Sequence, residues 1–158
     1  MEKVLFLDVD GVLTSTRYIV SKYRSNKIWK NSDLDFEAVQ RLVKIVKDTN
    51  CSIVVSSTWR CFGIGPNSKI YKSLLEKDGK LICDAIIDKT SESLKGFCRG
   101  DQIQEWINNN KFKGNFVILD DDSDMRDLKI FLVKTNTEEG LTDFKMQEVI
   151  NRLNKILC

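Results

Sequence analysis

The stretch that decides the fold is Lys3–Thr14, which reads KVLFLDVDGVLT. Its apolar part, Val4–Leu7, is a short run typical of a buried parallel strand. Asp8 and Asp10 follow, and residues i and i+2 of an extended segment point the same way, so we expect both carboxylates to crowd together at the carboxyl end of this strand. A cation or a shared proton is needed to relieve such a pair. Gly11 then permits a sharp turn and a close backbone approach to a ligand.

Composition limits the class of protein. The chain has 158 residues, of which 42% are hydrophobic and 30% charged, so we expect one soluble domain over residues 1–158. The net charge of +2 does not by itself indicate a nucleic-acid partner. The sequence has no apolar run near the roughly 18 residues that span a membrane, and it opens on a strand rather than a signal peptide. We therefore expect a cytoplasmic protein with no membrane partner.

The reactive residue types narrow the chemistry further. The five cysteines are scattered and lack any CxxC spacing, which predicts reduced thiols that fill the core and no disulfide-linked partner. The chain has no histidine, and this excludes Ser-His-Asp and Cys-His mechanisms as well as the common zinc-hydrolase sites. Any catalysis must use carboxylates, hydroxyls, lysines, arginines or thiols.

Hydrophobic patterns predict strands that alternate with helices. Further strands are expected at 52–55, 115–119 and 130–133, and segments 18–20 and 81–87 are candidates for short strands. Helices are expected at 33–48, from 67 or 68 to 76, from 101 into the asparagines at 108–110, and after an N-cap at Thr142. This alternation predicts an α/β fold, a three-layer α/β/α sandwich with a mainly parallel sheet.

Polar residues of similar chemistry follow three of the predicted strands. Asp8 and Asp10 follow the first, Ser56 and Ser57 the second, and the acidic run 120–124 the third. Since the carboxyl ends of parallel strands lie at one edge of a sheet, we expect these groups to converge. Carboxylates and hydroxyls with an arginine nearby suit a hard cation such as Mg²⁺ and a phosphate that it polarises.

The same motifs resemble those of the haloacid dehalogenase (HAD) superfamily. DVDGVLT at 8–14, the strand that ends in Ser56-Ser57, a basic residue just before the helix at Asp101, and ILDDDSDM at 118–125 resemble its motifs I to IV, in the expected order. SSTWR, RGDQIQEW and GLT are similar to segments of the small capless HAD domains of RNA-repair ("Swiss Army Knife") proteins.

This resemblance implies a Mg²⁺-dependent phosphomonoesterase that works through an aspartyl-phosphate intermediate. The implied substrates are terminal phosphates of RNA or DNA, in end processing or repair. One alternative is a small-metabolite phosphatase or nucleotidase with the same chemistry, and another is a HAD-fold binding module without turnover. The intact pair Asp8 and Asp10 argues against the binding module.

The resemblance also implies roles for the carboxylates. Asp8 is the expected nucleophile and a Mg²⁺ ligand. Asp10 is the expected general acid and base, and its backbone carbonyl is a further metal ligand. Asp120 and Asp121 compete for the remaining metal position, with Asp124 in support.

Other residues are expected to bind the phosphate. Ser56 or Ser57 would donate a hydrogen bond to it, and Gly11 belongs to the loop that approaches it. Arg99 is expected to neutralise charge during phosphoryl transfer, with Lys95 as the alternative.

Arg60 and two of the tryptophans have two interpretations each. Arg60 would bind a second phosphate or form a surface ion pair. Trp59 and Trp106 are interpreted as packing residues rather than as stacking platforms for bases.

The resemblance implies that a cap domain would lie soon after the first motif or between the second and third. Segment 14–31 is too short for a folded cap, and so is segment 60–95 once its own helix and strand are subtracted, so we expect an open site beside a short flap. The flap is rich in cations and aromatic rings, a mixture suited to a polynucleotide, although a solvated surface hairpin explains it as well. These side chains are Arg17, Tyr18, Lys22, Tyr23, Arg24, Lys27, Trp29 and Lys30.

Overall fold

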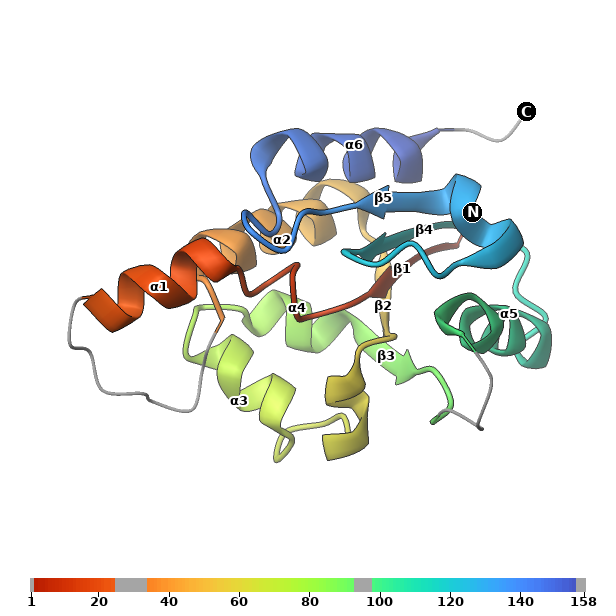
Figure 1. The fold of residues 1–158 in the computed structure, drawn as a ribbon. Coiled ribbons are helices and arrows are strands. Elements are labelled where there is room, and N and C mark those ends of the chain that lie inside the picture. The colour runs from red at the N-terminus through yellow and green to blue at the C-terminus, as the bar shows by residue number, and fades with distance from the viewer. Residues whose placement is uncertain (1, 25–33, 93–97, 156–158) are drawn as a thin grey trace.

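The computed structural model describes residues 2–24, 34–92 and 98–155 (Figure 1). Its strands are β1 Lys3–Leu7, β2 Ser52–Val55, β3 Ile86–Lys89, β4 Asn115–Asp120 and β5 Leu132–Lys134. Its α-helices are α1 Thr16–Arg24, α2 Phe36–Thr49, α3 Lys69–Leu75, α4 Lys80–Ala85, α5 Arg99–Asn109 and α6 Asp143–Asn154. Two short 3₁₀ helices are η1 Thr58–Phe62 and η2 Arg126–Phe131.

The strands form one five-stranded sheet in the order β3-β2-β1-β4-β5, and every pairing is parallel. Strand β1 lies at the centre, where Leu5 pairs with Ile53 of β2 and with Val117 of β4. The predicted parallel sheet is therefore confirmed. Its carboxyl edge collects the residues that follow β1, β2 and β4.

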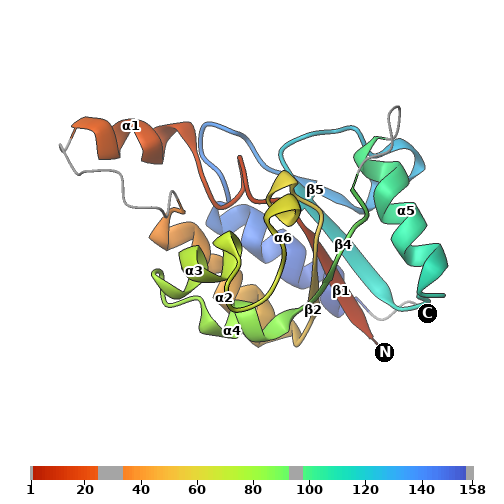
Figure 2. The same ribbon diagram turned by 90° about the horizontal axis from the view of Figure 1, so that it is seen from below.

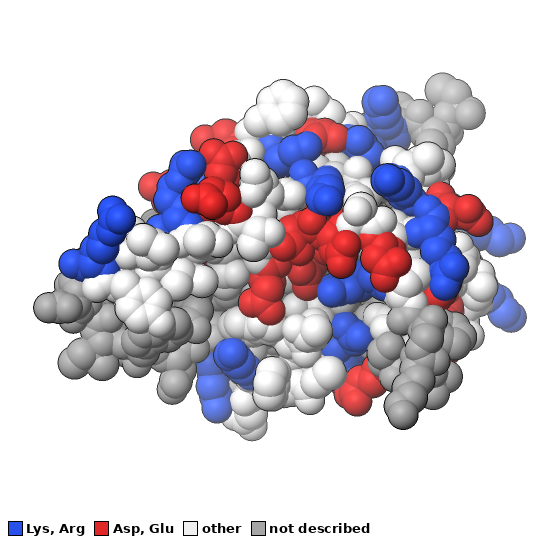
Figure 3. Space-filling view, in the orientation of Figure 1, with Lys and Arg blue, Asp and Glu red and all other residues white. Residues whose placement is uncertain are grey.

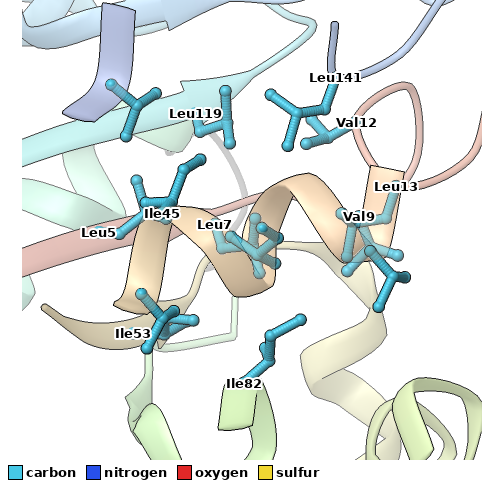
Figure 4. Packing of buried hydrophobic residues seen from close by; sticks show 14 of the residues in the cluster. Leu5, Leu7, Val9, Val12, Leu13, Ile45, Ile53, Ile82, Leu119 and Leu141 are labelled. Atoms are coloured by element: carbon cyan, nitrogen blue, oxygen red, sulfur yellow. The ribbon is translucent and has the colours of Figure 1, made fainter. Parts of the chain in front are cut away.

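Residues of β1 alternate between two hydrophobic cores, which explains why the strand is apolar throughout. Leu5 and Leu7 pack in the larger core with α2 and α4 (Figure 4). Val4 and Phe6 belong to the smaller core, where the ring centroids of Phe6 and Trp106 lie 5.4 Å apart in an edge-to-face contact. All four strand residues are fully buried. Trp106 is thus a packing residue, as expected.

The helices cover both faces of the sheet. Helices α2, α3, α4 and α6 supply residues to the larger core, and α5 and η2 supply residues to the smaller one. The view in Figure 2 shows these two groups on opposite sides of the strands. The structure confirms the predicted three-layer α/β sandwich.

The described part of the flap is a helix, so the predicted short strand at 18–20 is wrong. The hydroxyl of Ser15 accepts a hydrogen bond of 3.1 Å from the backbone N–H of Tyr18, and such a contact favours the start of a helix. None of the side chains of α1 is buried, and the helix extends away from the body of the protein in both ribbon views (Figures 1 and 2). Segment 25–33 lies outside the described residues.

Two predicted elements between the flap and β3 also differ. The helix expected from residue 33 begins at Phe36, because the carboxylate of Asp35 accepts the N–H of Glu37 at 3.0 Å and caps it. Segment 81–87 is mostly helix α4, and only its last residues enter β3. A short apolar run does not distinguish a helix from a strand, which explains the error.

The remaining boundaries move by a few residues. The strand expected at 130–133 begins at Leu132, because the preceding residues form η2. The helix expected from Asp101 begins at Arg99, so this arginine lies in the first turn rather than before it. Thr142 is the N-cap of α6, as predicted, and accepts the N–H of Lys145.

Within the described ranges, the intervals that follow β1 and β2 contain only small elements. Between β1 and α2 the described chain forms α1, and between β2 and residue 92 it forms η1, α3, α4 and β3. Helices α3 and α4 pack into the larger core beside α2 and so belong to the sandwich itself. No helix in the described part of the chain is long and apolar enough to cross a membrane.

Candidate active site

Asp8 is fixed at the carboxyl edge by the sheet itself. Its backbone N–H donates to the carbonyl of Leu119 at 3.0 Å, which extends the β1–β4 ladder by one residue. The chain then turns, because the carbonyl of Val9 accepts backbone hydrogen bonds from three residues, Val12, Leu13 and Thr14. Asp8 is only 4% exposed. Its carboxylate is therefore held at the mouth of the sheet by backbone geometry.

A cluster of three carboxylates forms at this edge. Oxygen atoms of Asp8, Asp120 and Asp121 all lie within 4.8 Å of one another. Asp120 ends β4 and is fully buried, whereas Asp121 is partly exposed and accepts a hydrogen bond of 2.9 Å from the hydroxyl of Thr137. The acidic side chains gather at the centre of the face seen in Figure 3. Asp124 is exposed and lies outside this cluster.

The pKa of Asp120 is raised by its surroundings. Burial raises the pKa of Asp120 to about 7, the negative charge of Asp8 adds to this effect, and Arg99 opposes it. The Oδ2 atom of Asp120 accepts no hydrogen bond from the described residues. A buried carboxylate beside two others, with an ion pair to Arg99 but no hydrogen bond at its Oδ2 atom, fits a hard divalent cation, whose preferred ligands are oxygen atoms.

Arg99 is the cation that the structure brings to these carboxylates. Its Nη1 atom donates to Asp8 Oδ1 at 3.1 Å and also to the backbone carbonyl of Ser56. The same nitrogen lies 3.3 Å from Asp120 Oδ2. Burial acts to lower the pKa of Arg99, but Asp8 and Asp120 outweigh it and raise the pKa. Lys95, the alternative, lies outside the described residues.

The structure separates the two serines that follow β2. Ser56 continues the ladder, since its N–H donates to the carbonyl of Leu7 at 2.9 Å, and its buried hydroxyl has no hydrogen-bond partner among the described residues. Ser57 is the N-cap of η1, where its hydroxyl accepts the N–H of Trp59 at 3.3 Å. Buried hydroxyls are normally paired, so the unpaired Ser56 is the one that fits a ligand.

Gly11 permits the close packing of the loop after β1. Its φ angle is +72°, and a Cβ atom here would lie 2.1 Å from the carboxylate of Asp121. Its carbonyl accepts a hydrogen bond of 2.8 Å from the hydroxyl of Thr135. The absence of a side chain therefore lets the loop and the carboxylate cluster approach each other.

Trp59 has a role at the site that the sequence interpretation missed. It packs in the larger core as expected, but its indole Nε1–H also donates to both carboxylate oxygens of Asp10, at 3.2 and 3.1 Å. Burial raises the pKa of Asp10, Asp8 raises it further, and the hydrogen bond from Trp59 acts in the opposite direction. The position of Trp59, two residues after Ser57, was the available signal, but spacing does not reveal where an indole N–H points.

Arg60 has a structural role that neither interpretation described. It is only 5% exposed, which contradicts a surface ion pair. Its guanidinium donates to the carbonyls of Ser56, Ser57 and Ser91 at 2.9, 2.8 and 3.1 Å, and to the side-chain oxygen of Gln102 at 3.0 Å. These bonds leave it little capacity to bind a second phosphate. They instead connect the loop after β2 to helix α5.

Comparison with protein-family models finds one match that spans most of the chain. The model described as "HAD domain in Swiss Army Knife RNA repair proteins" matches residues 4–146. Comparisons with curated proteins and with solved structures found no match. The matched range contains every residue of the carboxylate cluster as well as Asp10 and Arg99.

Proposed function

The chain belongs to the family of HAD domains in Swiss Army Knife RNA repair proteins, and from this we propose that it is a Mg²⁺-dependent phosphomonoesterase. The observation that carries the proposal is the convergence of Asp8, Asp120 and Asp121 with the guanidinium of Arg99 at one edge of the sheet. A carboxylate nucleophile, a cation site and a fixed positive charge are the parts that phosphoryl transfer from a monoester requires.

The proposed reaction has two steps. In the first, a carboxylate oxygen of Asp8 attacks phosphorus, the bond to the leaving oxygen breaks, and Asp10 gives that oxygen its proton. In the second, Asp10 takes a proton from a water molecule, whose oxygen attacks the aspartyl phosphate and releases inorganic phosphate and free Asp8. Arg99 stabilises the charge on the transferring group, and Ser56 orients it through its unpaired hydroxyl.

The cation site is proposed for Mg²⁺. Asp8, Asp120 and Asp121 offer carboxylate oxygens, and the backbone carbonyl of Asp10 offers a further one. When bound, Mg²⁺ neutralises and positions the phosphoryl oxygens.

The proposed substrate is a terminal phosphate on RNA or DNA. The description of the family supports this class, because it names RNA repair. The exposed carboxylate of Asp10 also supports it, since the described residues place no cap domain over this side of the site. The cations Arg17, Lys22 and Arg24 of α1 add positive charge, although Arg17 is paired with Glu139 at 3.3 Å. Lys27, Trp29 and Lys30 lie outside the described residues.

Hydrolysis of p-nitrophenyl phosphate with and without Mg²⁺ tests the proposed activity. We expect Asp8→Asn to abolish turnover, because an amide is a poor nucleophile and a poor ligand for the cation. Asp10→Asn should cripple turnover while Mg²⁺ still binds, since the backbone carbonyl is retained. The matched control is Asp127→Asn, an exposed aspartate of η2 that should keep wild-type rates. Wild-type rates in Asp8→Asn would refute the mechanism, and no turnover by the wild-type chain would favour a binding module.

A comparison of substrates tests the nucleic-acid part separately. We expect a higher kcat/KM for a phosphorylated oligonucleotide than for mononucleotides or sugar phosphates, and lower activity as salt rises. Equal or better efficiency on the small phosphates, without salt sensitivity, would support a metabolite phosphatase instead.

A further inference from the structure

Three side chains beside the proposed general acid form a cluster that the mechanism does not use. The carboxylate of Asp10 accepts the indole N–H of Trp59, whose side chain is otherwise buried. The ammonium nitrogen of Lys69 lies 4.0 Å from the centroid of the Trp59 ring and 5.6 Å from that of Phe62. Lys69 is exposed, and Phe62 is 63% exposed at the end of η1. The cluster thus runs outward from the site to an exposed cation and an exposed ring.

The chemistry of the first step requires the leaving group to lie beside Asp10. Attacking and leaving oxygens lie on opposite sides of phosphorus, so the leaving group points away from Asp8. A general acid must lie within about 3 Å of the oxygen that it protonates, so the first atoms of the leaving group must contact Asp10. Trp59 contacts Asp10 directly, the nitrogen of Lys69 lies over the Trp59 ring, and the ring of Phe62 lies near that same nitrogen.

We propose that Lys69 and Phe62 form the leaving-group subsite, and that it binds the nucleotides next to the terminal phosphate of a single strand. This proposal rests on the proposed phosphatase function, and it identifies the part of the substrate that the enzyme contacts beyond the terminal phosphate. The ammonium group of Lys69 pairs with the first internal phosphodiester, and the exposed ring of Phe62 stacks on a base. Trp59 positions Lys69 and Asp10, because its ring contacts the ammonium group of Lys69 and its N–H donates to the carboxylate of Asp10.

The position of Lys69 favours this cluster over α1 as the principal contact for the nucleotide next to the terminal phosphate. Helix α1 extends away from the body of the protein, and its Arg17 is paired with Glu139 (Figure 2). Lys69 instead lies over the same indole that touches the general acid. The subsite therefore lies within one side chain of the reacting atoms, and an adjacent nucleotide reaches it directly.

Binding without turnover tests the subsite. The titration uses Asp8→Asn, without added Mg²⁺ because this variant loses a cation ligand, and a fluorescent single-stranded oligonucleotide that carries a terminal phosphate, in separate 5′-phosphate and 3′-phosphate arms. When Phe62→Ala is added to this variant, the oligonucleotide that binds, with either the 5′-phosphate or the 3′-phosphate, should bind about tenfold more weakly, because one base stack is lost. The matched control is Phe144→Ala, since Phe144 is 76% exposed and also has a lysine nitrogen, that of Lys145, 5.7 Å from its ring. This control should leave the affinity unchanged.

Kinetics on the otherwise wild-type enzyme give the second readout. We expect Phe62→Ala and Lys69→Met each to raise KM for the oligonucleotide about tenfold, whereas Phe144→Ala should leave this KM unchanged. Lys69→Met should also reduce the slope of log K against log salt by about 0.7, the value for one phosphate contact on a single strand. If Phe62→Ala and Lys69→Met leave the affinity and KM for the oligonucleotide unchanged while the wild-type enzyme hydrolyses aryl phosphate, the proposed subsite is wrong. No Mg²⁺-dependent hydrolysis by the wild-type enzyme would overturn the phosphatase function on which the subsite rests.

Discussion

Trp59→Phe isolates the contribution of one hydrogen bond to the proposed general acid. Phenylalanine keeps an aromatic ring in the core but removes the indole N–H that donates to both oxygens of Asp10. Without this donor the carboxylate is free to rotate away from the leaving oxygen. We therefore expect a lower kcat with little change in KM.

The expected size follows from the exposure of Asp10. A hydrogen bond to a charged group contributes about 1.5–3 kcal/mol in a typical folded protein. Because Asp10 is exposed to water, we expect a value near or below the lower end of that range, about 1–2 kcal/mol. Asp10 gains negative charge as it gives up its proton, so the bond is stronger in the transition state, and its loss should lower kcat by about 5-fold to 30-fold.

The assay compares a good and a poor leaving group. An aryl phosphate needs little protonation of its leaving oxygen, whereas an alkyl phosphate depends on the general acid. Trp59→Phe should therefore slow the alkyl phosphate by the full factor and the aryl phosphate much less. Equal losses on both substrates, or a large drop in melting temperature, would indicate a packing defect and refute the positioning role of Trp59.

Three other predictions concern the loops and thiols around the site. Arg99→Ala should lower kcat/KM by at least about 100-fold, because a preorganised charge is lost, and Lys95→Ala should have a mild effect; the reverse order would move this role to Lys95. Gly11→Ala should lower both the melting temperature and the activity, because its φ of +72° and the 2.1 Å approach of a Cβ to a carboxylate leave no room for a side chain; an unchanged melting curve would contradict this. Iodoacetamide at pH 8 should modify the exposed Cys61 well before Cys83, since burial raises the pKa of Cys83 to about 11, and the difference should shrink as the pH rises toward that value; equal rates by mass spectrometry at pH 8 would contradict it.

The sequence was sufficient to predict a parallel sheet and the approximate positions of four of its strands, because these four are short apolar runs. The convergence of Asp8 with Asp120 follows from parallel topology alone, since the two residues end neighbouring strands. The role expected for Arg99 came from the resemblance to the third motif; the structure brings Arg99 into contact with Asp8, although it lies in the first turn of α5 and not before the helix.

The errors came from segments whose conformation depends on tertiary contacts. Residues 81–87 are apolar apart from Asp84, so the run has no period that separates a helix from a strand, and Ile82 and Cys83 of the helix pack in the larger core. Residues 18–20 have the β-branched composition of a strand, but the hydroxyl of Ser15 caps them as the start of a helix.

The roles of Arg60 and Trp59 were beyond sequence reasoning for a different reason. Both follow Ser57 within a few residues, so spacing places both near the site. In the 3₁₀ turn of η1, the side chain of Arg60 points inward to backbone carbonyls, and the indole N–H of Trp59 points to Asp10. The direction of a side chain after a tight turn is a property of the folded chain, and the sequence pattern does not contain it.

The central claim is that Asp8 forms a covalent bond to the phosphoryl group, and mass spectrometry of an acid-quenched reaction tests it most directly. With Asp10→Asn, Mg²⁺ and an aryl phosphate, whose leaving group needs little protonation, hydrolysis of the intermediate should slow more than its formation. We predict a peptide that contains Asp8 and carries the added mass of one phosphoryl group, which is absent when Asp8→Asn is combined with Asp10→Asn. A phosphoryl group on a different residue, or turnover without any labelled peptide, would contradict the account.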